Sequence, residues 1–369
     1  MNFAKYIEKS KIFLFYIFLF LISDAVYSNF FYNSNYKSNC TFSHNKLTFL
    51  EKNCSFKQKY IRRVSPYNVL TDEFGFRSSG KKFNSNKENI FYFGDSFAYG
   101  LGLDYSKTFV GKIEKAKNDF NHLNFSLQGY SPTVYLYQFK EMINKKIYPK
   151  KIILSLDFTD IFEEINRQSA REEINETINA VYSANSTTIF KEDFNDNTFK
   201  KKNFKASVFL AQSTNSFFRN IRLLISQKIS EPTLEPGKTT VGNFLYTPFE
   251  DLNTTFSDKS SFSDVIKSIS VTIKEIGNLS KDLETDLYIL IYPYPDTMRF
   301  GQKYFNWEEY AKNICIESRC KKLLNSFPAF DEFKNKNEDW LGKLFIDGDL
   351  HHSELGHTII SELIISELN

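Results

Sequence analysis

Short apolar runs alternate with segments of helical periodicity over most of the chain beyond residue 88. Five runs predict strands, at 89–93, 122–127, 151–156, 286–292 and 321–326. Between them, apolar residues recur every three or four positions and predict helices around 109–116, 134–143, 161–165, 265–283 and 355–368. Strands that are apolar on both faces and separated by helices form parallel sheets covered on both sides. The pattern therefore predicts an α/β protein: a three-layer α/β/α domain with a short parallel sheet.

Two stretches break this rhythm. Residues 29–88 are polar and dotted with aromatic residues, and we expect them to form an extended lead-in. Residues from about 167 to 262 are rich in Asn, Ser and Thr and show no strand series, so we expect a polar insertion above the sheet. The main domain is then expected at 89–369, interrupted by this insertion.

The extreme N-terminus carries basic residues, followed by the almost wholly apolar stretch 12–23. This order is typical of a secretory signal. The apolar stretch is shorter than the roughly 20 residues that span a bilayer as a helix. Residues 1–28 are accordingly expected to be a cleaved signal peptide or an uncleaved membrane anchor, and a buried core helix is the less favoured alternative. Either form of export places the domain in the cell envelope, on its periplasmic or extracellular face.

Composition and cysteine usage agree with an exported globular protein. Apolar residues make up 41 % of the chain, enough for a buried core, and the net charge of +3 comes without a basic stripe. These features disfavour a nucleic-acid partner. The four cysteines fall into two local pairs, Cys40 with Cys54 and Cys315 with Cys320, and predict two short-loop disulfides. A zinc site lacks the usual C-x-x-C spacing, and four free thiols remain an alternative.

The first candidate for chemistry follows the strand at 89–93, where the sequence reads Gly94-Asp95-Ser96. Ligands bind at the carboxyl ends of strands in open parallel sheets. A Ser on a tight turn there would expose its hydroxyl and direct backbone N–H groups at an oxyanion. An ordinary helix N-cap is the competing interpretation, since these residue types are good capping residues.

The second candidate is the loop before the last helix, where three of the chain's five histidines lie between His351 and His357. A His beside a carboxylate is an oriented general base. A solvated helix start, capped by Ser353 and Glu354, and a metal site made of the His and Asp residues are the alternatives. The two candidates together, in one α/β domain, favour a serine nucleophile with a histidine base.

These segments resemble the SGNH/GDSL hydrolase superfamily. Gly94-Asp95-Ser96 matches its first block, and 93–109 (FGDSFAYGLGLDYSKTF) is similar to the envelope branch of O-acetyltransferase- and esterase-like proteins. Four more segments resemble family blocks or branch segments: 124–132 (NFSLQGYSP), 151–160 (KIILSLDFTD), 292–295 (YPYP) and 349–357 (DLHHSELGH). The resemblance covers about 71–369 without the insertion, and it implies a flavodoxin-like α/β/α fold.

The resemblance implies Ser96 as the nucleophile. The family's catalytic His usually precedes a block Gly by five residues, which selects His351 before Gly356, with Asp349 as the residue that orients it. Asp349 with His352 would match the commoner Asp-x-x-His order, but the Gly then falls one residue short. Asp347 is a third choice as the orienting carboxylate.

Two residues depart from the family's oxyanion hole. Ser126 stands where the second block has a Gly, and it keeps a backbone N–H. Thr159 stands where the third block has an Asn, and its hydroxyl is shorter and differently aimed. Loss of one such donor typically costs ~10²–10³ in rate. Gly129 is expected to serve the turn, with its N–H as a further oxyanion candidate, and Arg77 is expected in a structural ion pair.

The expected function is that of a serine esterase or O-acyltransferase without cofactor or metal. The resemblance implies ester-linked acyl groups, acetyl above all, on an envelope polysaccharide. A non-catalytic envelope protein that binds glycan or an assembly partner through the same fold is the alternative. A lipase or thioesterase is a third option and would require a wide apolar cleft. No protein partner is indicated.

Overall fold

The computed structural model describes 40–60, 64–184, 262–302, 305–346 and 349–368, together with a few residues of 15–24. Most of the predicted signal or anchor segment lies outside the described residues, and so does 185–261 of the insertion predicted at about 167–262. Within the described part, no helix is both long and apolar enough to cross a membrane. All described residues from 40 onwards belong to one compact unit, formed by 38–191 and 235–369.

A sheet of eight strands organises this unit, in the order β10-β9-β8-β6-β7-β5-β4-β3. Its parallel part consists of β6 (Asn89–Phe93), β7 (Asn121–Asn124), β8 (Lys151–Leu156), β9 (Asp286–Ile291) and β10 (Lys322–Asn325). These are the five strands that the apolar runs predict. Sequence reasoning is confirmed here because each central strand is buried on both faces, so that no polar alternation obscures the run.

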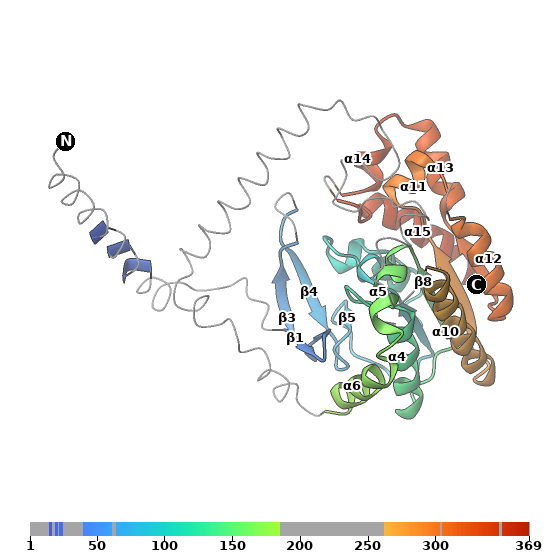
Figure 1. Cartoon of the computed structure of the whole chain (residues 1–369), viewed down its shortest axis with the longest axis horizontal. Helices are drawn as coiled ribbons and strands as arrows, with labels where there is room; N and C mark the ends of the chain where they lie inside the picture. The colour runs from blue at the N-terminus through green and yellow to red at the C-terminus, as the bar shows by residue number, and fades with distance from the viewer. Residues whose placement is uncertain are drawn as a thin grey trace. The chain divides into compact units, whose positions relative to one another are not determined.

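Helices cover both faces of the sheet (Figure 1). On one face, α4 (Pro132–Asn144), α5 (Thr159–Arg167), α6 (Arg171–Ser183), α10 (Phe262–Asp282) and α12 (Trp307–Glu317) cover Phe91 and Phe93. On the other, α3 (Phe109–Ala116), α13 (Phe327–Lys336), α14 (Trp340–Leu344) and α15 (Glu354–Glu367) cover Ile90 and Tyr92. Consecutive residues of β6 thus enter different cores, as the period of two along a strand requires. The predicted three-layer α/β/α class is confirmed.

The segment expected to be a plain lead-in builds part of the domain. After the hairpin of β1 (Thr41–His44) and β2 (Leu47–Leu50), three strands continue the sheet antiparallel: β3 (Ser55–Gln58), β4 (Tyr67–Thr71) and β5 (Arg77–Ser78). The sheet is joined where Arg77 of β5 pairs with Asn124 of β7. These strands are short, and the outermost one has no buried residue, so their sequence lacks an apolar run. The boundary at 89 is therefore too late.

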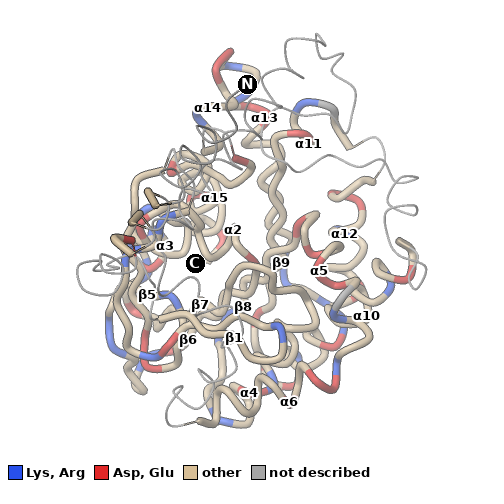
Figure 2. The backbone as a smooth tube through the Cα atoms, turned by 60° about the vertical axis from the view of Figure 1, so that its left-hand side comes forward, with Lys and Arg blue, Asp and Glu red and all other residues tan. Residues whose placement is uncertain are grey.

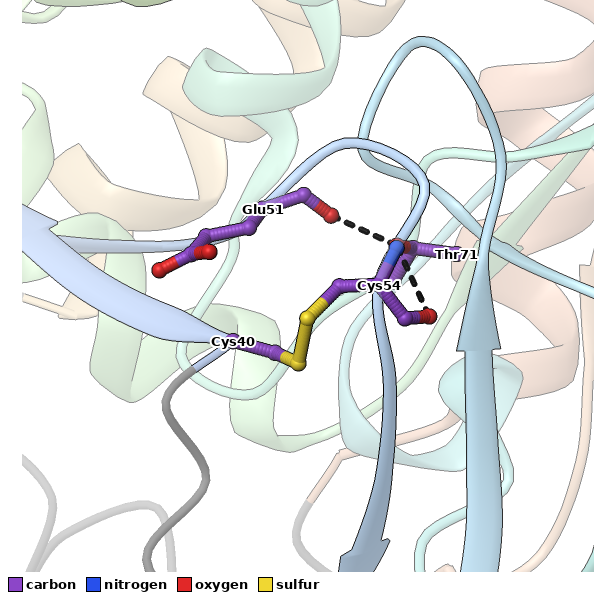
Figure 3. The surroundings of a disulfide bond; sticks show 4 residues. All are labelled: Cys40, Glu51, Cys54 and Thr71. Atoms are coloured by element: carbon purple, nitrogen blue, oxygen red, sulfur yellow. Dashed lines mark hydrogen bonds between the residues drawn. A yellow bond between two sulfur atoms is a disulfide. The ribbon is translucent and has the colours of Figure 1, made fainter. Parts of the chain in front are cut away.

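A disulfide between Cys40 and Cys54 fastens this N-terminal part (Figure 3). The Cys54 amide donates to Thr71 Oγ1 at 2.8 Å, and that hydroxyl donates to the Glu51 carbonyl at 2.5 Å. The second disulfide, Cys315–Cys320, closes the turn between α12 and β10. Both predicted pairs are confirmed. The charged residues lie mainly on helices and loops around the sheet, with both signs interspersed (Figure 2).

Candidate active site

The turn that presents Ser96 depends on Gly94, at the carboxyl end of β6. A Cβ at position 94 would lie 2.6 Å from the Ala98 Cβ and 3.1 Å from the Ser155 Cβ, so the chain passes there only as glycine. Asp95 then caps the one-turn helix α2 (Ser96–Tyr99), since its Oδ1 accepts from the Phe97 amide at 2.8 Å. Ser96 is thereby held at the first position of a helix, where backbone N–H groups have no partner within the helix.

Arg77 fixes the other end of α2. Its guanidinium donates to the carbonyl oxygens of Tyr99 at 2.5 Å and Gly100 at 2.8 Å, and also to that of Leu103. The group is fully buried and lies 4.6 Å from the centroid of the Tyr99 ring. In place of the predicted ion pair, Arg77 satisfies carbonyl groups that the end of a helix leaves unpaired. It therefore determines the path of the chain directly after the candidate nucleophile.

Ser96 and two residues of the distant C-terminal loop form one hydrogen-bonded chain. Ser96 Oγ lies 2.8 Å from His351 Nε2, and His351 Nδ1 lies 2.9 Å from Asp349 Oδ1. Asp349 and His351 are buried, whereas Ser96 is partly exposed. With Nδ1–H donating to the carboxylate, Nε2 is left to accept from the Ser96 hydroxyl. The arrangement is that of a nucleophile, a general base and a group that orients the base.

Tyr60 is a fourth member that the sequence did not reveal. Its hydroxyl lies 3.1 Å from His351 Nδ1 and is also hydrogen-bonded to Asp349. Burial raises the pKa of Asp349, but hydrogen bonds from His351 and Tyr60 outweigh this, and the pKa lies below its usual value. Burial and the contact with Asp349 raise the pKa of Tyr60, so this phenol remains a hydrogen-bond donor.

The other two histidines between 351 and 357 make different contacts: His352 lies in the loop and His357 in α15. His352 Nε2 lies 3.2 Å from the Pro293 carbonyl oxygen, and burial lowers the pKa of this imidazole to about 3. His357 Nδ1 accepts from the Phe109 amide at 3.1 Å. The alternative pair Asp349–His352 is thus not formed, while Asp347 lies outside the described residues. In the described ranges, no group of three or more His, Cys, Asp and Glu residues is arranged to hold a metal ion.

The residues predicted for the oxyanion hole have other partners. The Ser126 amide donates to Asn124 Oδ1 at 3.2 Å. Ser126 nevertheless lies beside the turn that carries Ser96, because a Cβ on Gly94 would be only 3.5 Å from the Ser126 hydroxyl oxygen. Gly129 adopts φ +75°, and its carbonyl accepts from Arg167 at 3.4 Å. Within the described chain, no hydrogen bond joins Gly129 to Ser96.

The Thr159 hydroxyl is hydrogen-bonded to two carboxyl groups and not directed to the place predicted for the oxyanion. Oγ1 lies 2.5 Å from Asp95 Oδ2 and 2.6 Å from Asp157 Oδ1, and the Thr159 amide donates to the same Asp157 oxygen at 2.8 Å. A Thr two residues after an Asp readily closes such a local turn. Spacing placed Thr159 at the carboxyl end of β8 but did not reveal where its hydroxyl points.

Thr159 belongs to a buried acidic cluster beside Ser96. Asp157 also accepts hydrogen bonds from two tyrosines, Tyr292 at 2.7 Å and Tyr294 at 2.8 Å. Burial, and after it the charge of Asp157, raises the pKa of Asp95 well above its usual value. The same two causes, with the charge of Asp95 added, raise the pKa of Asp160.

No protein-family model and no curated protein sequence matches the chain. Among solved structures, the chain is similar to TesA, with 10 % identity, a TM-score of 0.40, and coverage of 76 % of this chain and 98 % of that one. It is similar also to a mutant of Axe2, an acetyl-xylooligosaccharide esterase from Geobacillus, with 13 % identity, a TM-score of 0.39, and coverage of 76 % of this chain and 93 % of that one. A third similar structure is that of a lipolytic protein of the G-D-S-L family from Veillonella parvula, with 12 % identity, a TM-score of 0.39, and coverage of 76 % of this chain and 98 % of that one.

The structure from Veillonella parvula is described as a member of the G-D-S-L family, which the sequence motifs of this chain resemble. TM-scores below 0.5 at such identities carry nothing about the activity of this chain. The chain's own structure shows the mostly parallel sheet between two helical layers and the hydrogen-bonded Ser96, His351 and Asp349.

Proposed function

We propose that the protein is a serine esterase or O-acyltransferase in which Ser96 becomes acylated. One observation carries the proposal, the unbroken chain of hydrogen bonds from Ser96 through His351 to Asp349. The three residues come from opposite ends of the sequence, and each has the geometry that its role requires.

In the first half of the reaction, the Ser96 oxygen attacks the carbonyl carbon of a bound ester while His351 Nε2 takes the hydroxyl proton. The carbonyl π electrons move onto the oxygen, and Asp349 stabilises the imidazolium through Nδ1–H. When the tetrahedral intermediate collapses, the C–O bond to the alcohol breaks and His351 returns the proton to that alcohol. An acyl-enzyme on Ser96 remains.

In the second half, water or a sugar hydroxyl attacks the acyl carbon with His351 again as the base. Water gives hydrolysis, and a sugar hydroxyl gives acyl transfer. The proton then passes from His351 to Ser96 Oγ as that oxygen leaves, which restores the starting state. No cofactor is required by these steps.

The oxyanion is assigned to the backbone N–H groups of Ser96 and Ser126. The Ser126 amide has to leave Asn124 Oδ1 before it can donate, and the Gly129 amide is the second candidate for this place. With Thr159 held by two carboxyl groups, the hole lacks the side-chain donor of the resembled family. A donor of this kind is typically worth ~10²–10³ in rate, so we expect a slow enzyme.

The proposed substrates are acyl esters, acetyl esters above all, of an envelope polysaccharide. Support comes from the signal-like N-terminus, from the two disulfides, which suit an oxidising compartment, and from the resemblance to the envelope branch. The same features support a location in the cell envelope, with the protein either secreted or anchored.

A second candidate function is that of a non-catalytic envelope protein that binds glycan. The observation that favours it is the engagement of Thr159 and of the Ser126 amide by other side chains. A protein that had lost catalysis would have no need for a free oxyanion hole.

Labelling and hydrolysis separate the two functions. Full-length protein, its Ser96→Ala variant and an exposed-serine control, Ser366→Ala, are treated with a fluorophosphonate and analysed by intact mass. Release of p-nitrophenol from p-nitrophenyl acetate is measured in parallel. We expect labelling and release by the wild type and by Ser366→Ala and neither by Ser96→Ala. Equal, background-level results for all three would reject the enzyme and favour the binding protein.

A further inference from the structure

The Thr159 hydroxyl lies between two carboxyl groups and cannot satisfy both. Its oxygen is 2.5 Å from Asp95 Oδ2 and 2.6 Å from Asp157 Oδ1, both within the range of charge-assisted O–H···O hydrogen bonds. A hydroxyl carries one proton and donates once, and an ionised carboxylate only accepts. Two short contacts to two carboxylates would leave one pair of oxygens facing each other without a proton. One of the two carboxyl groups therefore has to supply the second proton.

The remaining partners show which carboxyl group it is. Asp157 accepts from the Thr159 amide at 2.8 Å, from Tyr292 at 2.7 Å and from Tyr294 at 2.8 Å, and so has donors on both of its oxygens. Asp95 Oδ1 accepts from the Phe97 amide. Among the described residues, the only other hydrogen-bonding atom near Asp95 Oδ2 is Ser96 Oγ, at 3.4 Å, and the Ser96 hydroxyl is directed to His351.

We propose that Asp95 is a neutral carboxylic acid in the resting protein and a positioning residue for Ser96. Its Oδ2–H donates to Thr159 Oγ1, whose own proton goes to Asp157 Oδ1. This inference rests on the proposed function, because its benefit lies in the acylation of Ser96. An ionised Asp95 would hold a negative charge 3.4 Å from the oxygen at which the tetrahedral intermediate forms. A neutral Asp95 still caps α2, and the negative charge then lies on Asp157, on the far side of the Thr159 hydroxyl.

The surroundings of Asp95 favour the neutral form. From the end of β8 and from α5 it faces Asp157, Asp160 and Glu163, and the charges of Asp157 and Glu163 act against a further negative one. Tyrosines face it from the other elements packed around it: Tyr135 of α4 and Tyr292 and Tyr294 after β9. Beyond Ser96 lie His351 and Asp349. Burial also raises the pKa of Asp95 and so favours the neutral form.

Infrared spectroscopy tests the proton directly and without reference to activity. A protonated carboxyl group has a C=O stretch separate from the amide bands, and this stretch shifts in D₂O. We expect the spectrum of full-length wild type at about pH 7 minus that of Asp95→Asn to contain such a band, and the difference between wild type and the matched variant Asp160→Asn to contain none. The absence of the band from wild type overturns the proposal, whether or not any variant folds. Loss in Asp160→Asn and retention in Asp95→Asn overturns it as well.

The consequence for Ser96 is tested by a pH profile of p-nitrophenyl acetate hydrolysis, corrected by Ser96→Ala. Asn is uncharged at every pH, and its Nδ2–H₂ can replace the donor to Thr159. We expect Asp95→Ala to lose at least about tenfold in kcat and Asp95→Asn to recover most of this loss. We also expect the fall of kcat at alkaline pH, shown by the wild type, to be absent from Asp95→Asn. Folded Asp95→Asn at the level of Ser96→Ala, or with an unchanged alkaline decline, overturns the positioning role. Wild type at the level of Ser96→Ala rejects the proposed function instead, and the infrared result still stands.

Discussion

The hydroxyl of Tyr60 lies 3.1 Å from Nδ1 of His351, the ring nitrogen that does not face Ser96. Because Nδ1–H is directed to Asp349, the Tyr60 hydroxyl gives its own proton to the same carboxylate. An aromatic residue from a segment expected to be a plain lead-in thus completes the support of the candidate base.

Tyr60→Phe removes that donor and changes the acid side of the pH profile. The Tyr60 hydrogen bond holds the pKa of Asp349 low, so its loss raises that pKa and the carboxylate protonates at a higher pH. We expect the acidic decline of kcat/KM to move up by as much as about one pH unit, with roughly a three- to tenfold loss at neutral pH. Hydrolysis measured between about pH 4 and pH 8 checks this. An unmoved acidic decline would show that Tyr60 merely fills space.

His352 is expected to govern acid stability, not catalysis. Its pKa in the folded protein is about 3, against an ordinary value of 6.5. Above about pH 6.5 neither the folded nor the unfolded form is protonated at this site. As the pH falls from there towards 3, the unfolded chain takes up a proton that the folded one refuses, and stability is lost. At roughly 1.4 kcal/mol per pKa unit, the full loss is about 5 kcal/mol.

Urea unfolding of wild type and His352→Gln at several pH values measures this contribution. The Gln amide can still donate to the Pro293 carbonyl, and it does not titrate. We expect a shallower fall of unfolding free energy with acid in the variant, and Ser96-dependent hydrolysis should persist. By contrast, His351→Gln should abolish hydrolysis. If His352→Gln were the inactive variant, the assignment of the base to His351 would be wrong.

The parallel strands could be predicted from the sequence because their positions are decided locally, by burial on both faces. Gly94, Asp95 and Ser96 were found for a similar reason: a turn directly after a buried strand leaves a local signature. The antiparallel strands β3 to β5 leave none, because β3 has no buried residue, β4 is buried only at alternate positions and β5 is two residues long. Tyr60 meets His351 across 291 positions of sequence, and nothing near Tyr60 predicts the contact.

Thr159 illustrates a different limit. Its place at the carboxyl end of β8 follows from the strand before it, but the direction of its hydroxyl depends on which oxygens lie within reach. Asp95 and Asp157 come from neighbouring strand ends, and together they capture it. The pattern of residue types gives the neighbourhood of a side chain, and the hydrogen-bond partners are decided only in the packed structure.

Arg77 is expected to control both stability and the shape of the nucleophile turn. Replacement by Met keeps much of the apolar stem but removes the hydrogen bonds to the carbonyls of Tyr99, Gly100 and Leu103, of which the Gly100 carbonyl keeps the Leu103 amide as a donor. Loss of three hydrogen bonds from one charged group costs about 3 kcal/mol or more in total. We expect Arg77→Met to lower the midpoint of urea unfolding, and Arg77→Lys to recover only a part because an ammonium cannot reach as a planar fork. Stability equal to wild type in both variants would contradict this role.

Gly94→Ala tests whether close packing, and not backbone freedom, sets the position of Ser96. The added methyl would stand 2.6 Å from the Ala98 Cβ, a distance that real side chains do not adopt, so the turn or α2 has to shift. A displacement of the nucleophile by about 1 Å can cost on the order of 10² in rate, and we expect a loss of that size in Ser96-dependent hydrolysis.

Gly342→Ala, which adds a methyl inside helix α14 with 3.3 Å to its nearest neighbour, is the matched control and should leave hydrolysis unchanged. The double variant Gly94→Ala/Ala98→Gly removes the closest clash but leaves Ser155 at 3.1 Å, so it should recover activity only in part. Full activity in the single variant would mean that the turn yields without moving Ser96, and the geometry that joins Ser96 to His351 would then not depend on Gly94.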